Sequence, residues 1–176
     1  MKNKLRQYAK ELRNTLSIQD LSVKIKNNLF SMPEFKSSKN ILAYYSMGSE
    51  VCTYDYFDDY SKNWFLPKID GENLLVCPYN GCKLSQNRYK ILEPENQNIS
   101  DESIIDMVII PAVCADKNGY RLGYGKGYYD RFIKRLTHKP LKVILVYSKL
   151  FFDNVYPDSF DEKCDFIVTD KEIYKV

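Results

Sequence analysis

The run IDMVIIPAVCA, residues 105–115, constrains the fold of this chain most strongly, because it is the most apolar stretch of the sequence. Its nearly continuous series of apolar, largely β-branched residues is typical of a strand that is buried on both faces, as in parallel sheets. A similar run, LKVILVYS at 141–148, predicts a second buried strand. We therefore expect a parallel sheet with the first run near its centre.

Shorter runs predict the remaining elements. Strands are expected at 40–47, 63–69, 73–79, 89–94 and 164–170, where β-branched and aromatic residues gather between turn residues. Helical spacing of apolar residues predicts a pair of helices over 2–32, and a helix at 128–136. Ser17 opens a capping-box-like start for the second helix, which Pro33 limits. Thr53 is expected to cap a short helix that runs to Tyr60.

Strands that alternate with helices predict an α/β fold, with a mostly parallel sheet flanked by helices. A length of 176 residues suits a single domain, in which the helical pair 2–32 packs on the α/β core. The polar segment PENQNISDES, 94–103, is expected to be an exposed loop rather than a domain boundary.

Composition narrows the functional classes. The net charge of +3, from 26 basic and 23 acidic residues, does not indicate a dedicated nucleic-acid binder. No signal peptide is recognisable and no apolar run is long enough to span a membrane, so we expect a cytoplasmic protein. Five irregularly spaced cysteines predict reduced thiols: Cys52, Cys77, Cys82, Cys114 and Cys164.

A zinc site is not expected, because the chain has only one histidine and no second close cysteine pair. The segment CPYNGC, 77–82, is instead expected to form a turn. His138 is expected to have a structural role at the end of the helix predicted at 128–136.

Three of the seven glycines, Gly123, Gly125 and Gly127, lie in RLGYGKGYYD between a predicted buried strand and a predicted helix. Ligands bind beyond the carboxyl ends of parallel strands, and a helix N-terminus there favours phosphate. Glycines let the backbone approach an anion closely, while Lys126 and Arg121 add positive charge. The P-loop pattern and G-x-G-x-x-G are both absent. The sequence thus predicts a phosphate cradle without specifying its type.

The run NGYRLGYGKGYYDRFI, 118–133, resembles the signature of 5-formyltetrahydrofolate cyclo-ligases, also called methenyltetrahydrofolate synthetases. That signature is close to G-x-R-L-G-x-G-x-G-Y-Y-D-R, and every position of 119–131 matches it. Four other segments resemble the family in the same order along the chain. KNKLR at 2–6, with Arg13, resembles the family's opening segment, and SEVCT at 49–53 resembles its E-x-x-T segment. FLPKI at 65–69 resembles the end of a family strand, and DEKCDFIVT at 161–169 resembles the closing D-x-x-x-D segment. The sequence departs from the family at Ala115, where an aromatic residue is common, and at Phe160, often His.

The resemblance implies a Rossmann-like fold of the NagB, RpiA and CoA-transferase kind. It implies ATP- and Mg²⁺-dependent conversion of 5-formyltetrahydrofolate to 5,10-methenyltetrahydrofolate, with release of ADP and phosphate. The formyl oxygen would be phosphorylated, and N10 would then attack the formyl carbon. The expected partners are ATP and the folate, with or without a polyglutamate tail. We expect a monomer that binds neither nucleic acid nor membrane.

The resemblance also implies the roles of individual residues. The expected ATP contacts are Lys2, Asn3, Lys4, Leu5, Arg6, Arg121, Leu122, Gly123, Tyr124, Gly125, Lys126, Gly127, Tyr128 and Tyr129. The expected folate contacts are Glu50, Tyr124, Gly125, Lys126, Gly127 and Tyr128. Catalytic roles fall to Lys126, Arg121 and Tyr128, and the expected Mg²⁺ ligands are Asp130 and Asp165.

Two other functions fit parts of the sequence. The basic first helix and the aromatic, basic loop are compatible with a nucleotide- or RNA-binding module, because tyrosines can stack on bases. A sugar-phosphate or CoA-ester enzyme on a related α/β fold would also use a phosphate cradle.

Overall fold

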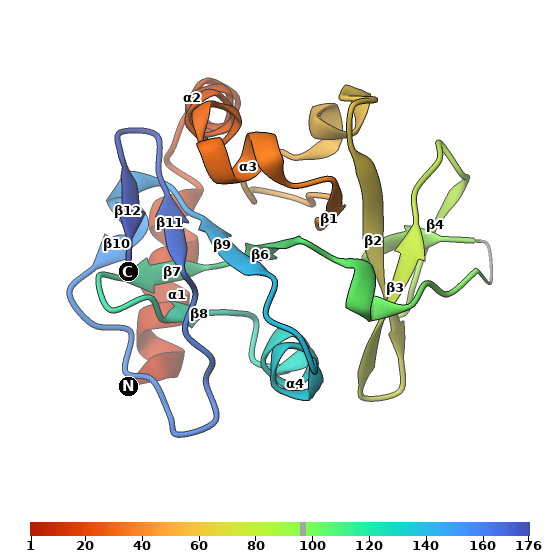
Figure 1. Cartoon of the computed structure of the whole chain (residues 1–176). Helices are drawn as coiled ribbons and strands as arrows, with labels where there is room; N and C mark the ends of the chain where they lie inside the picture. Colours follow the sequence, from red (N-terminus) through yellow and green to blue (C-terminus); the bar gives the residue numbers. More distant parts are fainter. Residues whose placement is uncertain (96–97) are drawn as a thin grey trace.

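A seven-stranded sheet forms the centre of the computed structural model, which describes residues 1–95 and 98–176 (Figure 1). Its strand order is β12-β11-β9-β6-β1-β2-β3. The five inner strands pair in parallel: β1 (Asn40–Leu42), β2 (Asn63–Asp70), β6 (Met107–Pro111), β9 (Leu141–Leu145) and β11 (Phe166–Val168). The edge strands β3 (Asn73–Pro78) and β12 (Ile173–Lys175) are antiparallel. The prediction of a mostly parallel sheet is confirmed.

Helices flank this sheet. Figure 1 shows α2 (Ile18–Ser31) and α3 (Pro33–Ser37) on one side of it and α4 (Tyr128–Arg135) on the other. The first helix, α1 (Lys2–Arg13), completes the predicted N-terminal pair. Pro33 does not merely limit α2, because it begins α3 at a position where a missing N–H costs nothing. Ser17 is the N-cap of α2, but its side chain makes no capping hydrogen bond.

The run 105–115 is not the single strand that the sequence predicts. Its central part, β6, ends at Pro111, which has no N–H to continue the ladder. The chain then enters β7 (Cys114–Asp116), which belongs to a separate three-stranded sheet with β8 (Arg121–Leu122) and β10 (Phe151–Phe152). The glycine loop therefore follows the short strand β8 rather than the central strand.

The strand predicted at 40–47 also ends early, at Leu42. The hydroxyl of Thr53 donates to the carbonyl of Tyr44 (2.6 Å) and accepts from the amide of Ser46 (3.1 Å), so these backbone groups are bonded outside the sheet. Thr53 itself precedes a 3₁₀ helix, η1 (Tyr54–Asp58), and gives it no side-chain cap.

Other differences are local. The strand predicted at 89–94 is shortened to β5 (Leu92–Pro94), which pairs with β4 (Leu84–Gln86). In the predicted loop 94–103, a 3₁₀ turn, η2 (Glu102–Ile104), begins, and positions 96–97 lie outside the described residues. All five cysteines are free thiols. Within residues 1–95 and 98–176, no helix is long and apolar enough to cross a membrane.

Candidate active site

The glycine loop, residues 123–127, connects β8 to α4 in a conformation that requires glycine at two positions. Gly125 has φ +93° and Gly127 has φ +66°, values that other residues rarely adopt. Gly127 is the N-cap residue of α4. A Cβ at Gly127 would lie 2.9 Å from Nη1 of Arg131, which itself donates to the carbonyl of Lys126. The loop is thus a tight backbone turn that leads into a helix N-terminus.

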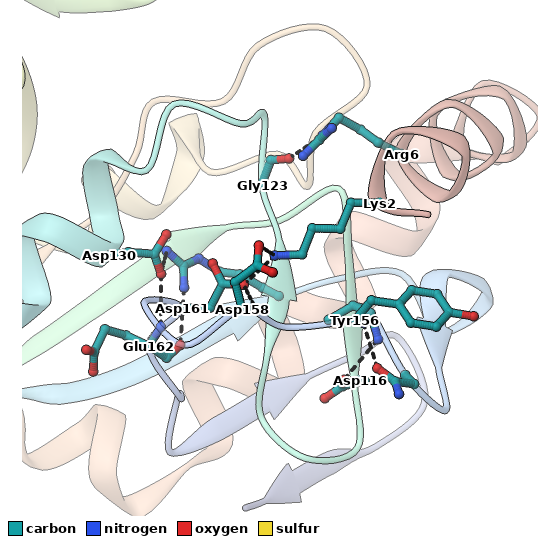
Figure 2. A network of polar contacts seen from close by, with 12 residues as sticks. Lys2, Arg6, Asp116, Gly123, Asp130, Tyr156, Asp158, Asp161 and Glu162 are labelled. Carbon is teal, nitrogen blue, oxygen red and sulfur yellow. Dashed lines mark hydrogen bonds and ion pairs between the residues drawn. The ribbon is translucent and has the colours of Figure 1, made fainter.

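Two cations of α1 reach this region from the other end of the chain. Arg6 Nε donates to the carbonyl of Gly123 at 2.9 Å, and Lys2 Nζ lies 2.6 Å from carboxylate oxygens of both Asp158 and Asp161 (Figure 2). Asn3 supports Arg6 by accepting from its Nη1 at 2.6 Å. The structure thus joins the N-terminal segment to the glycine loop and to the segment 158–161.

The remaining members of the predicted ATP segment 2–6 are placed differently. Lys4 is exposed, and Leu5 packs against the hydrophobic core. Leu122 is buried, at 3% exposure. The side chain of Lys4 makes no described hydrogen bond to the glycine loop, and the two leucine side chains have no polar atom that could make one.

A cleft of about 360 Å³ lies beside the glycine loop. Its walls carry three cationic side chains and one carboxylate, so its charge favours an anionic ligand. The lining residues are Gly125, Lys126, Gly127, Asp130, Arg131, Lys134 and Phe160.

Arg121 lies beneath the loop and not in this cleft. Its side chain is only 5% exposed, and its Nη2 lies 3.1 Å from Oδ1 of Asp130. The amide of Glu162 also donates to Oδ1 of Asp130, at 3.1 Å (Figure 2). This geometry makes Arg121 a residue that positions Asp130 at the wall of the cleft.

The two predicted magnesium ligands have different surroundings. Oδ2 of Asp130 makes no described hydrogen bond or ion pair, and Asp130 lines the cleft, so one oxygen suits a cation bound there with phosphate. Asp165 instead accepts from the amide of Lys142 (2.8 Å) and faces its Nζ (3.7 Å). In the part of the chain that the structure describes, no three His, Cys, Asp or Glu residues form a metal-binding group. A shared Mg²⁺ stays a prediction.

Glu50, the predicted folate contact, belongs to a buried polar cluster beside the loop. It is 6% exposed, and its Oε2 accepts from the amide of Met47 at 2.9 Å. Arg13, 5% exposed, donates through Nε to Ser49 (2.9 Å) and through Nη2 to the Tyr124 hydroxyl (3.1 Å). Tyr124 therefore brings the glycine loop into contact with the cluster that contains Glu50.

The tyrosines after the loop divide into two kinds. The hydroxyl of Tyr128 donates to the carbonyl of Gly71 at 3.3 Å, and the centres of the Tyr128 and Tyr89 rings are 6.5 Å apart. Lys126 Nζ lies 5.6 Å from the centre of the same Tyr89 ring. Tyr129, in contrast, has a buried hydroxyl without a hydrogen-bond partner among the described residues.

The sequence did not single out Tyr89, because nothing local distinguishes it among 15 tyrosines. His138, as expected of a structural residue, is bonded through Nε2 to the carbonyl of Ile105 at 2.9 Å.

Asp116 is a second residue that the sequence does not single out. It is fully buried, and its carboxylate accepts from the amides of Asn118 (3.0 Å), Tyr120 (3.2 Å) and Val155 (3.0 Å). It thereby ties the β7–β8 turn to the segment that leads to Asp158 (Figure 2).

We expect Asp116→Ala to lower the free energy of unfolding by about 3 kcal/mol or more, because three amides lose a charged acceptor. Urea denaturation measures this. The control is Asp153→Ala, which removes an exposed ion pair with Lys117 and should cost less than about 1 kcal/mol. Equal losses in the two variants would contradict the role given to Asp116.

The buried position of Glu50 has a consequence for stability. Burial raises the pKa of Glu50, and the Met47 amide, the Tyr124 hydroxyl and the charge of Arg13 offset this only in part. A carboxyl whose pKa is raised on folding stabilises the fold most below its unfolded pKa, and this contribution is lost as pH rises through the folded pKa. The buried Glu50 carboxyl therefore makes the fold less stable at neutral pH than at acidic pH.

We expect Glu50→Gln to raise the free energy of unfolding at pH 7, with no gain below pH 4.5, the ordinary pKa of the group. Urea denaturation across pH measures this effect. The exposed Glu11→Gln is the control, and a loss of stability at pH 7 in Glu50→Gln alone would refute the prediction.

Comparison with known proteins adds to this geometry. The model of the 5-formyltetrahydrofolate cyclo-ligase family matches residues 1–170. The chain is 30% identical to the 5-formyltetrahydrofolate cyclo-ligase of Mycoplasma pneumoniae, covering 97% of this chain and 99% of that protein. It is 28% identical to a probable 5-formyltetrahydrofolate cyclo-ligase of Schizosaccharomyces pombe, and the match covers 90% of this chain and 88% of that protein. A solved structure of 5,10-methenyltetrahydrofolate synthetase from Aquifex aeolicus is similar, with a TM-score of 0.87 and 34% identity. The match covers 99% of this chain and 92% of that one.

Proposed function

The chain belongs to the 5-formyltetrahydrofolate cyclo-ligase family, and from this we infer that it converts 5-formyltetrahydrofolate to 5,10-methenyltetrahydrofolate with ATP. The observation that carries the inference is the contact between the phosphate-type glycine loop and the buried Glu50 cluster, which Tyr124 makes. A loop suited to phosphate and a buried polar cluster suited to a heterocycle adjoin each other, as a phosphoryl transfer to a folate requires.

We propose that the cleft beside the loop takes the triphosphate. Lys126, Arg131 and Lys134 line it and would neutralise phosphate oxygens, while the turn at Gly125 and Gly127 lets the backbone approach them. Lys2 and Arg6 lie at the adjoining end of α1 and would add positive charge once phosphate competes for their present acceptors.

ATP is needed because the N5-formyl group is an amide, whose carbonyl is a weak electrophile and whose oxygen leaves poorly. In the proposed reaction the formyl oxygen attacks the γ-phosphorus and ADP departs, leaving an imidate-type phosphate. N10 then forms a bond to the formyl carbon and loses its proton. The C–O bond breaks, and phosphate leaves with the former formyl oxygen. The protein contributes positioning and charge neutralisation, as in other phosphoryl transfers.

Several side chains have distinct parts in this proposal. Lys126 would stabilise charge on the transferred phosphoryl group, while Arg121 holds Asp130 in place. Tyr128, which borders the loop, would orient the reacting end of the folate. Mg²⁺, when bound, would neutralise charge on the phosphates. Asp130 would be its main protein ligand, and Asp165 would be the second.

Neither of the other functions that fit parts of the sequence is favoured by a specific contact. The monomeric state, a polyglutamate tail on the substrate and a cytoplasmic location remain our expectations.

Incubating the protein with 5-formyltetrahydrofolate, ATP and Mg²⁺ tests the proposal. Methenyltetrahydrofolate, followed by its absorbance, should form with one ADP for each product molecule. Tetrahydrofolate without the formyl group is the control and should give no ADP. ATP hydrolysis without methenyltetrahydrofolate would refute the proposal, and tight, salt-dependent RNA binding without turnover would favour a binding module instead.

A further inference from the structure

Phe160 is the one aromatic residue among the described residues that line the cleft beside the glycine loop. It is 60% exposed, and every other side chain that lines the cleft is charged. A single exposed aromatic side chain is common on protein surfaces and by itself indicates nothing. Here, however, it forms part of the wall of a cleft whose cations favour an anionic ligand. The cleft thus offers positive charge for an anionic group and one flat apolar face for a ring.

The turn that carries Phe160 is fixed by its own hydrogen bonds. The amide of Asp161 donates to the carbonyl of Asp158 at 3.1 Å, and Oδ2 of Asp161 accepts from the amide of Asp158 at 2.7 Å. These bonds close a four-residue turn in which Phe160 is the third residue. Neither bond involves Lys2, so the turn keeps its shape when phosphate draws Lys2 away from the two carboxylates.

The turn is also tied to the elements that border the cleft. Lys2 Nζ joins both carboxylates of the turn to α1 and lies 5.8 Å from the centre of the Phe160 ring (Figure 2). Directly after the turn, the amide of Glu162 donates to Oδ1 of Asp130, in the first turn of α4. Phe160 is therefore an exposed ring on a held backbone, and a ligand that stacks on it has little chain to order.

The nucleotide is the ligand best placed to use this ring. The cations of the cleft are those that would neutralise its phosphates, and its base is joined to these phosphates through the ribose. The folate is less well placed, because no lining residue of the cleft belongs to the polar cluster around Glu50. The volume of about 360 Å³ lies in the usual range for small-molecule sites.

We propose that Phe160 stacks on the base of the nucleotide whose phosphates bind in this cleft. The inference rests on the proposed function and deepens it, because it names the residue that meets the nucleoside end of ATP. Phe160 stands where the family often has His, so this ring is a feature of the present chain. The base is remote from the transferred phosphoryl group, so the contact should act equally on the bound substrate and on the transition state.

Calorimetric titration with ATP and with inorganic tripolyphosphate, without folate and at one Mg²⁺ concentration, tests the proposal. Tripolyphosphate presents the phosphates without the base. Phe160→Ala should weaken ATP binding about 5- to 100-fold, the usual contribution of one stacked base, and should leave tripolyphosphate binding unchanged. In steady-state kinetics the KM for ATP should rise by the same factor while kcat and the KM for folate stay unchanged.

Three further variants sharpen the test. Phe160→Tyr keeps a stacking face and should bind ATP as the wild type does. Phe160→Leu keeps an apolar side chain without that face, so its ATP affinity should lie between those of the wild type and Phe160→Ala; it also covers the case in which the alanine variant does not fold. Tyr60→Ala removes a 90% exposed aromatic side chain that does not line the cleft, and it should bind both ligands normally.

Equal ATP affinity in Phe160→Ala and the wild type would overturn the proposal. Equal weakening of ATP and tripolyphosphate would also overturn it, since the ring would then only shape the cleft for phosphate. A rise in the KM for folate without a change for ATP would assign the ring to the other substrate instead. Because the titration needs no turnover, its failure in a protein that forms methenyltetrahydrofolate would refute only this inference. A wild type that binds ATP but never forms methenyltetrahydrofolate would refute the proposed function instead.

Discussion

Replacing Lys126 with alanine is expected to lower kcat about 10²- to 10³-fold while the fold keeps its stability. Lys126 is exposed, lines the cleft and forms no ion pair with any described residue, so its charge is available to a ligand. A cation that meets charge developing on the transferred phosphoryl group acts mainly in the transition state, which is why kcat should fall more than KM rises. The free energy of unfolding should change by less than about 0.5 kcal/mol.

Lys163 offers a matched control for this variant. Lys163 lies 5.4 Å from the ring of Tyr120, much as Lys126 lies 5.6 Å from that of Tyr89, but Lys163 does not line the cleft. Lys163→Ala should therefore leave kcat unchanged. If both variants turned over at the wild-type rate, the assignment of Lys126 would be wrong even with the activity itself established.

Asp130→Ala should reduce both stability and turnover, for two separable reasons. The change leaves the Arg121 guanidinium, 5% exposed, without its ion-pair partner, and this should cost about 3–5 kcal/mol. Loss of the carboxylate at the cleft wall should also lower turnover about 100-fold or more. Urea denaturation and steady-state kinetics measure the two effects independently.

The double variant Arg121→Met, Asp130→Leu separates these effects. Apolar side chains in place of the pair should recover most of the lost stability, because no buried charge is left unpaired. Turnover should stay low, since the carboxylate is still missing. Glu102→Ala, which removes a partly exposed partner of Arg135, is the stability control and should cost about 1 kcal/mol or less. A fully active double variant would show that Asp130 has only a structural part.

The sequence was informative where the determining pattern is local. The apolar runs at 105–115 and 141–148 predicted buried parallel strands, and β6 and β9 are such strands. The positive φ angles at Gly125 and Gly127 agree with the backbone freedom for which the sequence analysis singled out these glycines. Departures arose where a side chain takes over a backbone partner, as Thr53 does at the end of β1.

The site depends more on contacts between distant segments, which no local pattern encodes. The family resemblance implied that Lys2 contacts phosphate, and in the structure Lys2 is paired with Asp158 and Asp161. Arg121, expected to contact ATP, is buried because it lies in β8, before the glycine loop. The sequence does not indicate the roles of Asp116 and Tyr89, because their partners lie in distant segments of the chain.

The central claim is that the loop holds the γ-phosphate against the formyl oxygen, and an isotope experiment tests it most directly. 5-Formyltetrahydrofolate labelled with ¹⁸O in its formyl group is converted with unlabelled ATP in unlabelled water, and the released phosphate is analysed by mass. Each phosphate should carry one ¹⁸O, because the formyl oxygen leaves bonded to the transferred phosphorus. Methenyltetrahydrofolate accompanied by unlabelled phosphate would contradict transfer to that oxygen.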